Sequence, residues 1–169
     1  QLIENYLIKN QIINDHPKLT KLLVNDYLSK SQTNKACEVF SKIKDSIQDN
    51  YLSRFNIYCL INDNKKEEAQ LLLDLMKEQG FGEKFYENKI NFLMGYSSQP
   101  DVEISENTIL DFHLSHRTNP QFKFEPKDST SKKIWKYLST SNLLDDIKDI
   151  ELTDVNKINS IEKATHEKH

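Results

Sequence analysis

The stretch that decides the fold is "YLSRFNIYCLINDNKKEEAQLLLDLM", residues 51–76. Its apolar residues recur every three or four positions on both sides of the polar turn "NDNKK", and this is the spacing of amphipathic helices. Asn64 and Glu67 form a capping-box-like pair, so the second helix is predicted to begin at Asn64. Gly80 is expected to end it. The stretch therefore predicts two helices, the first over about 50–61, joined by a short turn.

The same pattern recurs along the chain at an offset of 33 residues. The polar segment "SQTNKA" at 31–36 aligns with "NDNKKEEA" at 62–69. Apolar positions align as well: Ala36, Val39, Phe40 and Ile43 fall on Ala69, Leu72, Leu73 and Met76, and Leu52, Ile57, Leu60 and Ile61 fall on Phe85, Ile90, Leu93 and Met94. A period of 33–34 residues with two helices per unit is typical of a helical solenoid, in which neighbouring hairpins cover each other's apolar faces.

Residues 51–76 resemble a degenerate tetratricopeptide unit, and residues 18–43 resemble a weaker copy of it. The matching positions are the small residue where two helices cross and the apolar positions after it: Ala69, Leu73 and Met76 in one unit, Ala36 and Phe40 in the other. The chain departs from the family in lacking its early tryptophan and closing proline, and in carrying Ile57 and Val24 where glycine is frequent. The resemblance covers roughly residues 1–94 and implies an antiparallel helical array with a concave binding surface.

A second resemblance concerns the segment "DLMKEQGF", 74–81, which is similar to uncharacterised helical proteins of alphaproteobacteria. It implies a bacterial source and carries no function with it.

The remaining proline and helix-capping residues predict helices along the rest of the chain. Pro17 favours a helix start and predicts a helix to about Lys30. Further helices are expected over 2–14, from Thr33 or Asn34, over 83–94, from a Ser105 cap to about His116, over 129–139 and 143–150, and from 154. The predicted fold class is all-α, with hairpins stacked as a short tetratricopeptide-like α-solenoid in 1–95 and a C-terminal helical cap in 96–169.

An extended connector is expected over 117–127, because Pro120 and Pro126 restrict the residues before them. Phe122 and Phe124 then point to the same side, at the two-residue period of extended chain. They are expected to cover the end of the helical stack above Trp135. The alternative is that these three aromatic residues form a docking patch for a partner.

Composition limits the function classes. The chain of 169 residues has 23 Lys and Arg against 26 Asp and Glu, a net charge of −3, which argues against a general nucleic-acid binder. No apolar run approaches the roughly 20 residues of a membrane span. Cys37 and Cys59 match no metal-ligand spacing and are expected to be reduced and partly buried. Reduced cysteines favour the cytoplasm slightly over the periplasm.

The histidines give a weak metal signal. His113 and His116 are three residues apart and could share a helix face, but zinc needs a third and a fourth ligand. The terminal "HEKH", 166–169, has three-residue spacing where the zinc-protease motif needs four. No Gly-x-Ser-x-Gly motif is present, and three glycines cannot build a phosphate loop. The sequence therefore predicts no metal, no cofactor and no catalytic residue, with His113 as a partly buried histidine beside Leu110 and Leu114.

The function expected from the tetratricopeptide resemblance is that of a non-enzymatic scaffold or adaptor that binds a protein or peptide partner. The first helix of each hairpin would line a mildly basic groove that suits an acidic or amphipathic peptide. Its polar residues are Lys21, Tyr51, Arg54, Tyr58, Glu87 and Asn91. The alternative for this surface is a solvated face without a partner.

A rival hypothesis from another class is that the chain is a helical module of a larger enzyme, such as the superhelical arm of a cell-wall hydrolase. The chain begins with Gln1 and not with Met, which favours a piece of a longer protein. The sequence leaves the partner, the oligomeric state and the compartment open.

Overall fold

The fold was analysed in a computed structural model, which describes residues 5–6, 14–40 and 47–144. Within these ranges every regular element is a helix, so the all-α prediction is confirmed. The helices are α2 (Pro17–Ser29), α3 (Thr33–Glu38), α4 (Asn50–Asn62), α5 (Lys66–Glu78), α6 (Lys84–Met94), α7 (Ile109–Thr118) and α8 (Lys132–Thr140). The helix predicted from 154 lies outside the described residues, as do most of the residues of the helices predicted over 2–14 and over 143–150.

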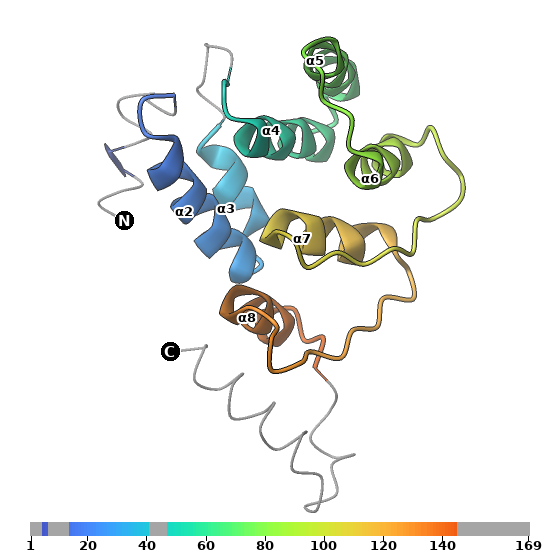
Figure 1. Ribbon diagram of the computed structural model, residues 1–169. Coiled ribbons are helices and arrows are strands. Elements are labelled where there is room, and N and C mark those ends of the chain that lie inside the picture. Colours follow the sequence, from blue (N-terminus) through green and yellow to red (C-terminus); the bar gives the residue numbers. More distant parts are fainter. Residues whose placement is uncertain (1–4, 7–13, 41–46, 145–169) are drawn as a thin grey trace, which may run out of the picture.

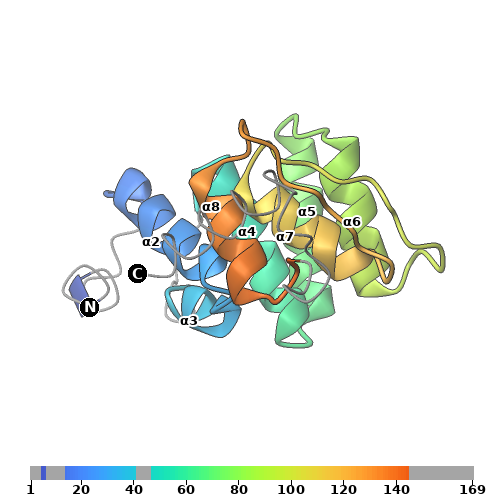
Figure 2. The ribbon, with the colours of Figure 1, turned by 90° about the horizontal axis from the view of Figure 1, so that it is seen from below.

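The helices form two groups with α7 between them (Figure 1). Helices α2 and α3 lie at one end of the molecule, and α5 and α6 lie at the other end (Figure 2). Neighbours in sequence pack in pairs, α2 on α3, α4 on α5 and α6 on α7, while α2 also contacts α4, α7 and α8. Helix α2 thus contacts α7 and α8 as well as its neighbours in sequence, and the solenoid arrangement stays a prediction.

The turns that join the first two pairs have the same backbone geometry. Ser31 and Asn64 lie 33 residues apart, at φ 56° and 61°. The residues that follow them, Gln32 and Lys65, have φ −95° with ψ 54° and 57°. In both turns a backbone amide bonds back to the end of the preceding helix, from Gln32 to Tyr27 at 2.9 Å and from Lys65 to Leu60 at 2.8 Å. The prediction of Asn64 as an N-cap is wrong, because its left-handed conformation ends α4 and α5 begins at Lys66 without a side-chain cap.

Small residues sit where the paired helices cross. Ala36 on α3 and Ala69 on α5 are both fully buried. A larger side chain at either position would hold the two helix backbones apart. The two positions identified from the offset of 33 residues are therefore both core positions, while the repeat and membership of the tetratricopeptide family stay predictions.

The start of α7 differs from the prediction. Thr108, not Ser105, is the N-cap, and its Oγ1 accepts a hydrogen bond from the Asp111 amide at 3.1 Å. The same hydroxyl donates to the Asp111 carboxylate at 2.7 Å, so the two side chains fix each other. A threonine followed three residues later by an aspartate is a better start signal than the isolated Ser105.

A buried lysine holds the loop that leads to α7. Lys89 on α6 is fully buried, and its Nζ donates to the carbonyls of Asp101 and Glu103, each at 2.7 Å. The Asp101 carboxylate lies 3.2 Å from the same nitrogen. Burial lowers the pKa of Lys89, although the carboxylate of Asp101 opposes this effect. The loop is thereby fixed on α6 before the chain turns into α7.

The phenylalanines of the connector pack onto the helical core, whereas their predicted place above Trp135 stays a prediction. The ring centroids of Phe122 and Phe124 lie 5.5 and 4.9 Å from that of Phe112 on α7, both in edge-to-face geometry. Trp135 on α8 is 4% exposed. The two phenylalanines therefore extend the core under α7, and their packing supports the structural reading of the connector.

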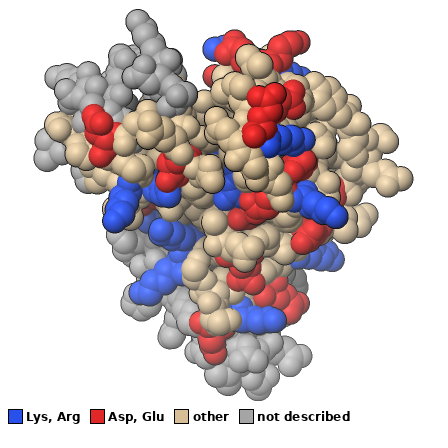
Figure 3. Space-filling view, turned by 45° about the horizontal axis from the view of Figure 1, so that its top comes forward, with Lys and Arg blue, Asp and Glu red and all other residues tan. Residues whose placement is uncertain are grey.

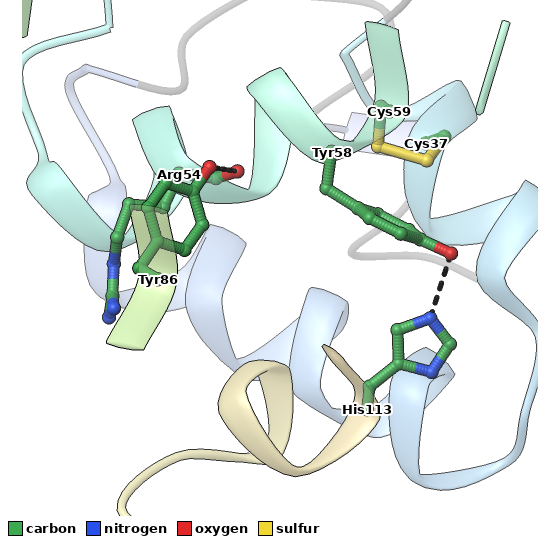
Figure 4. The surroundings of a disulfide bond; sticks show 6 residues. All are labelled: Cys37, Arg54, Tyr58, Cys59, Tyr86 and His113. Atoms are coloured by element: carbon green, nitrogen blue, oxygen red, sulfur yellow. Dashed lines mark hydrogen bonds between the residues drawn. A yellow bond between two sulfur atoms is a disulfide. The ribbon is translucent and has the colours of Figure 1, made fainter. Parts of the chain in front are cut away.

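A disulfide joins Cys37 on α3 to Cys59 on α4 (Figure 4). The prediction of two reduced cysteines is wrong. That prediction was made because the two cysteines match no metal-ligand spacing in the sequence. Their pairing depends instead on helix packing, which brings the Cα atoms of Cys37 and Cys59 to 5.4 Å from each other. The bond links the second helix of one hairpin to the first helix of the next, and the argument from reduced cysteines for the cytoplasm no longer applies.

We predict that Gly95→Ala lowers the free energy of unfolding by about 1 kcal/mol, because Gly95 ends α6 at φ 84°, where a Cβ is unfavourable. An added Cβ would meet only Lys66 Nζ at 3.9 Å, so the cost is one of backbone conformation. Gly82→Ala is the matched control, since its Cβ would also meet open space and its φ is not positive. Urea unfolding measures both; equal stability of the two variants would contradict the assignment.

Reduction of the disulfide is predicted to cost about 3 kcal/mol, the loop-closure entropy of a 22-residue separation. The denaturant midpoint of the wild-type protein should fall when a dithiol reductant is added. A Cys37→Ala/Cys59→Ala variant should unfold at a low midpoint that the reductant does not change. If the wild-type midpoint is also insensitive to the reductant, the bond does not form in solution.

Candidate functional site

Two of the six residues predicted to line the partner groove are covered by α7. Arg54 and Tyr58 on α4 are 8% and 3% exposed, and their side chains bond to Asp111 and His113 on α7. The expectation that these two residues lie on an open polar stripe is therefore wrong. The sequence pattern marked a face with polar groups correctly, but the polar groups are satisfied by another helix of the same chain.

The other four predicted groove residues are half-buried and have partners of their own. They lie on three helices, and the Lys21 ammonium is 5.9 Å from the ring centroid of Tyr51. Each is engaged locally: Lys21 pairs with Asp49 at 2.6 Å, Tyr51 donates to Asn25, Glu87 pairs with Lys77 at 2.9 Å, and the Asn91 carbonyl accepts from the Tyr96 amide at 2.9 Å. Their role in partner binding stays a prediction.

Arg54 is the centre of a buried ionic cluster. Its Nη1 lies 2.7 Å from a Glu83 carboxylate oxygen and 3.3 Å from one of Asp111. Its guanidinium carbon is 5.4 Å from the ring centroid of Tyr86, whose hydroxyl donates to the Arg54 carbonyl at 2.7 Å. Burial raises the pKa of Tyr86 well above its ordinary value. This cluster joins α4, α6 and α7 and is structural, because Arg54 and Asp111 are buried and paired, while Glu83 pairs with Arg54 from a partly exposed position.

A cavity lies on the other side of the contact between α4 and α7. It has a volume of about 500 Å³ and opens between the turn after α2, the start of α3, and helices α4, α7 and α8. We call it the histidine pocket. The lining residues that carry the argument are Lys35, Tyr58, His113, His116, Arg117 and Tyr137.

A chain of four hydrogen-bonded side chains forms one wall of the histidine pocket. The Tyr58 hydroxyl lies 2.8 Å from His113 Nε2, and His113 Nδ1 lies 2.9 Å from the Tyr137 hydroxyl. The same hydroxyl lies 2.8 Å from His116 Nδ1. Figure 4 shows Tyr58 pointing from α4 toward His113, with the disulfide at the next residue of the helix. The hydrogen bonds thus link α4 to α7, α7 to α8, and α8 back to α7.

Burial shifts the pKa of each member away from neutral. His113 is enclosed, and the loss of solvation lowers its pKa to about 3, with the nearby positive charge of Arg117 acting in the same direction. Burial likewise lowers the pKa of His116 and raises those of Tyr58 and Tyr137. At neutral pH all four side chains are therefore uncharged, and Arg117 and Lys35 supply the charge of the pocket.

The lining of the histidine pocket is positive and rich in hydrogen-bond donors. Besides Lys35 and Arg117 it has hydroxyl, amide and imidazole groups, and no carboxylate is among the described residues that line it. This differs from the surface in general, where Lys, Arg, Asp and Glu are mixed across the face in Figure 3. A site with this composition suits an anionic group, which accepts hydrogen bonds and donates none.

Sequence reasoning found part of this site. It predicted that His113 and His116 share a helix face, and both indeed contact the Tyr137 hydroxyl. It took His113 for a partly buried residue beside apolar neighbours and did not see its two tyrosine partners, which lie 55 and 24 residues away. Arg117 follows His116 directly and is one of only two arginines in the chain, which was the one available signal for an anion site.

The described residues contain no group of three or more histidine, cysteine, aspartate or glutamate side chains arranged to hold a metal ion. The "HEKH" segment lies outside them. Among the helices that the structure describes, none is long and apolar enough to cross a membrane. Comparison of the chain with protein-family models, with curated proteins and with solved structures finds no match.

We predict that His113 makes the fold sensitive to acid. Its folded-state pKa of about 3 lies below the ordinary value of 6.5, so the unfolded chain takes up the proton more readily. The stabilisation from the neutral imidazole is complete above pH 6.5 and is lost progressively as the pH falls toward 3. This one group should lower the free energy of unfolding by about 2 kcal/mol between about pH 7.5 and about pH 5.

Urea unfolding at these two pH values measures the effect. His113→Gln should lose most of this pH dependence, whereas the exposed His16→Gln should keep it. Equal pH dependence in His113→Gln and in the wild-type protein would show that another group is responsible.

Proposed function

We propose that the chain is a non-enzymatic binding module of the scaffold or adaptor class, which holds an acidic group of a protein partner in the histidine pocket. The observation that carries this proposal is the lining itself. Arg117 and Lys35 are accompanied by tyrosine, histidine and amide donors, without a carboxylate among the described lining residues to compete for them. A carboxylate of a partner chain would complete the charge balance of the pocket.

The protonation states of the pocket favour binding over acid–base chemistry. A general acid or base works best when its pKa lies near the working pH. His113, with a pKa of about 3, is a weak base, and the raised pKa values of Tyr58 and Tyr137 make them weak acids. The four side chains are therefore suited to hold fixed positions as donors and acceptors around a ligand.

The proposed binding site replaces the groove expected from the sequence. Arg54 and Tyr58 were assigned to that groove, and α7 now occupies it through Asp111 and His113. Tyr58 remains part of the proposed site, because it also lines the histidine pocket. The chemistry of the expected partner, an acidic peptide, is unchanged.

The proposal is tested by selection from a library of random peptides displayed against the immobilised protein. We expect the selected peptides to share an aspartate, a glutamate or a free C-terminal carboxylate. Arg117→Gln and Lys35→Gln should each weaken the binding of a selected peptide about tenfold, the worth of one charge-assisted hydrogen bond.

The matched control is Lys84→Gln, which removes one positive charge from an exposed position on α6, outside the pocket. Its affinity for the same peptide should equal that of the wild-type protein. Selected peptides without an acidic group, or equal losses in all three variants, would refute the assignment of the pocket.

A further inference from the structure

We propose that the histidine pocket takes up its anion together with one proton, which His116 carries, and that the hydrogen-bond chain through Tyr137 and His113 turns the Tyr58 hydroxyl toward the ligand at the same time. The inference rests on the proposed function in one respect, the binding of an anionic group. It adds that anion binding is coupled to the uptake of a proton and to a reversal of the hydrogen bonds that join His116, Tyr137, His113 and Tyr58.

The Tyr137 hydroxyl lies between two imidazole nitrogens of the same type. His113 Nδ1 is 2.9 Å away and His116 Nδ1 is 2.8 Å away. A hydroxyl has one proton to donate. When Tyr137 donates to one of these nitrogens, the other nitrogen must carry a proton and donate to the Tyr137 oxygen.

With both imidazoles neutral, the four hydrogen-bonded side chains can donate in either of two consistent directions. In the first, Tyr58 donates to His113 Nε2, His113 Nδ1 donates to Tyr137, and Tyr137 donates to His116. In the second, every bond is reversed: His116 donates to Tyr137, Tyr137 to His113, and His113 Nε2 to Tyr58. The first direction leaves His116 Nε2–H free as a donor to a ligand, and the second leaves the Tyr58 hydroxyl free.

Protonation of His116 selects the second direction. A charged imidazole carries hydrogen on both nitrogens, so Nδ1 must donate to the Tyr137 oxygen. Tyr137 then donates to His113 Nδ1, and His113 Nε2 donates to the Tyr58 oxygen. The Tyr58 hydroxyl is released from His113 while His116 Nε2 still carries its hydrogen. The pocket therefore gains a positive charge. It also gains a second free donor, since both His116 Nε2–H and the Tyr58 hydroxyl are available, whereas the uncharged network leaves only one of them free.

An anion favours the protonated state because it interacts with both new features. The groups that face His116 are otherwise uncharged or positive: Arg117 and His113 on its own helix, Tyr137 on α8, Tyr58 on α4 and Lys35 on α3. His116 is half-buried among them, and it is the member of the chain that solvent can reach, since His113 is 4% exposed. Without a ligand the positive neighbours oppose its protonation, and an anion reverses this balance.

The first experiment reads the proton positions directly. Nitrogen-15 NMR of the imidazole side chains distinguishes protonated from unprotonated ring nitrogens in the wild-type protein. With saturating sulfate as the probe, at about pH 6, we expect His116 to be protonated on both nitrogens and His113 to be neutral with its hydrogen on Nε2. A His113 that keeps its hydrogen on Nδ1 while His116 is charged would overturn the inference.

Ser141 provides a check on this reading, because its hydroxyl is the other polar group close to Tyr137 and it lines the same pocket. If Tyr137 donated to Ser141 in place of His113, the direction of the His113 bonds would not be forced. We expect the position of the His113 hydrogen in Ser141→Ala with sulfate to match that in the wild-type protein. A change in it would assign the proton of Tyr137 to Ser141 and overturn the coupling to Tyr58.

The second experiment measures the proton that accompanies binding. Calorimetric titration with sulfate, in buffers that differ in ionisation enthalpy, gives the number of protons taken up per ion bound. We expect about one proton near pH 6.5 in the wild-type protein and about none in His116→Gln. Tyr58→Phe should bind sulfate several-fold more weakly and still take up the proton. Wild-type binding without proton uptake would overturn the inference.

The outcomes separate this inference from the proposed function. Sulfate binding with proton uptake, combined with no selected acidic peptide, would support the coupling and reject the protein partner. Binding of an acidic peptide without proton uptake would do the reverse. If neither sulfate nor an acidic peptide binds, or if Arg117→Gln leaves sulfate binding unchanged, the histidine pocket is not an anion site and both proposals fail.

Discussion

The structure depends on the requirement that the polar groups buried between α4 and α7 find partners in each other. Arg54 and Tyr58 leave α4 on its inner side, and Asp111 and His113 meet them from α7. An unpaired guanidinium or imidazole at this depth would cost several kcal/mol, so α7 has one register in which both pairs form. The hairpins of α2–α3 and α4–α5 could be built without α7. Their arrangement around a common centre could not, because that centre consists of these two pairs and the aromatic residues beside them.

The contact between α4 and α7 has two sides that differ in charge and in access to solvent. On one side, Arg54 lies against two tyrosine rings and pairs with both Glu83 and Asp111, so its positive charge is more than balanced. On the other side, His113 and its tyrosine partners border a cavity with an excess of positive charge. The chain contains only two arginines, and one lies on each side of the interface. The first serves the fold, and the second is the group that a ligand can reach. This difference is why the proposed binding site lies beside α7 and not in the groove that α7 fills.

The sequence predicted local structure well and long-range structure poorly, for reasons that individual residues make clear. Pro17, Gly80 and Gly95 marked helix boundaries correctly, because each acts through its own backbone dihedrals. Asn64 was misread because an asparagine can either cap a helix start or adopt the left-handed conformation that ends a helix, and its type alone does not decide between these. Tyr58 and Cys59 were misread because their partners are remote in sequence. The periodicity identified the face of α4 that carries polar groups, but it could not say that another helix would cover that face.

The disulfide has a mechanical consequence for the pocket. Cys59 follows Tyr58 directly, so the covalent anchor and the hydroxyl that reaches His113 belong to the same turn of α4. Turning α4 about its long axis would swing that hydroxyl away, and the sulfur bridge to α3 restrains such a rotation. Two residues before Cys37, Lys35 stands on the opposite wall, so the bridge also sets how far apart the two walls stand. The width of the opening is in this way held by a strong chemical bond, whereas its far side, on α7 and α8, is held only by weak contacts.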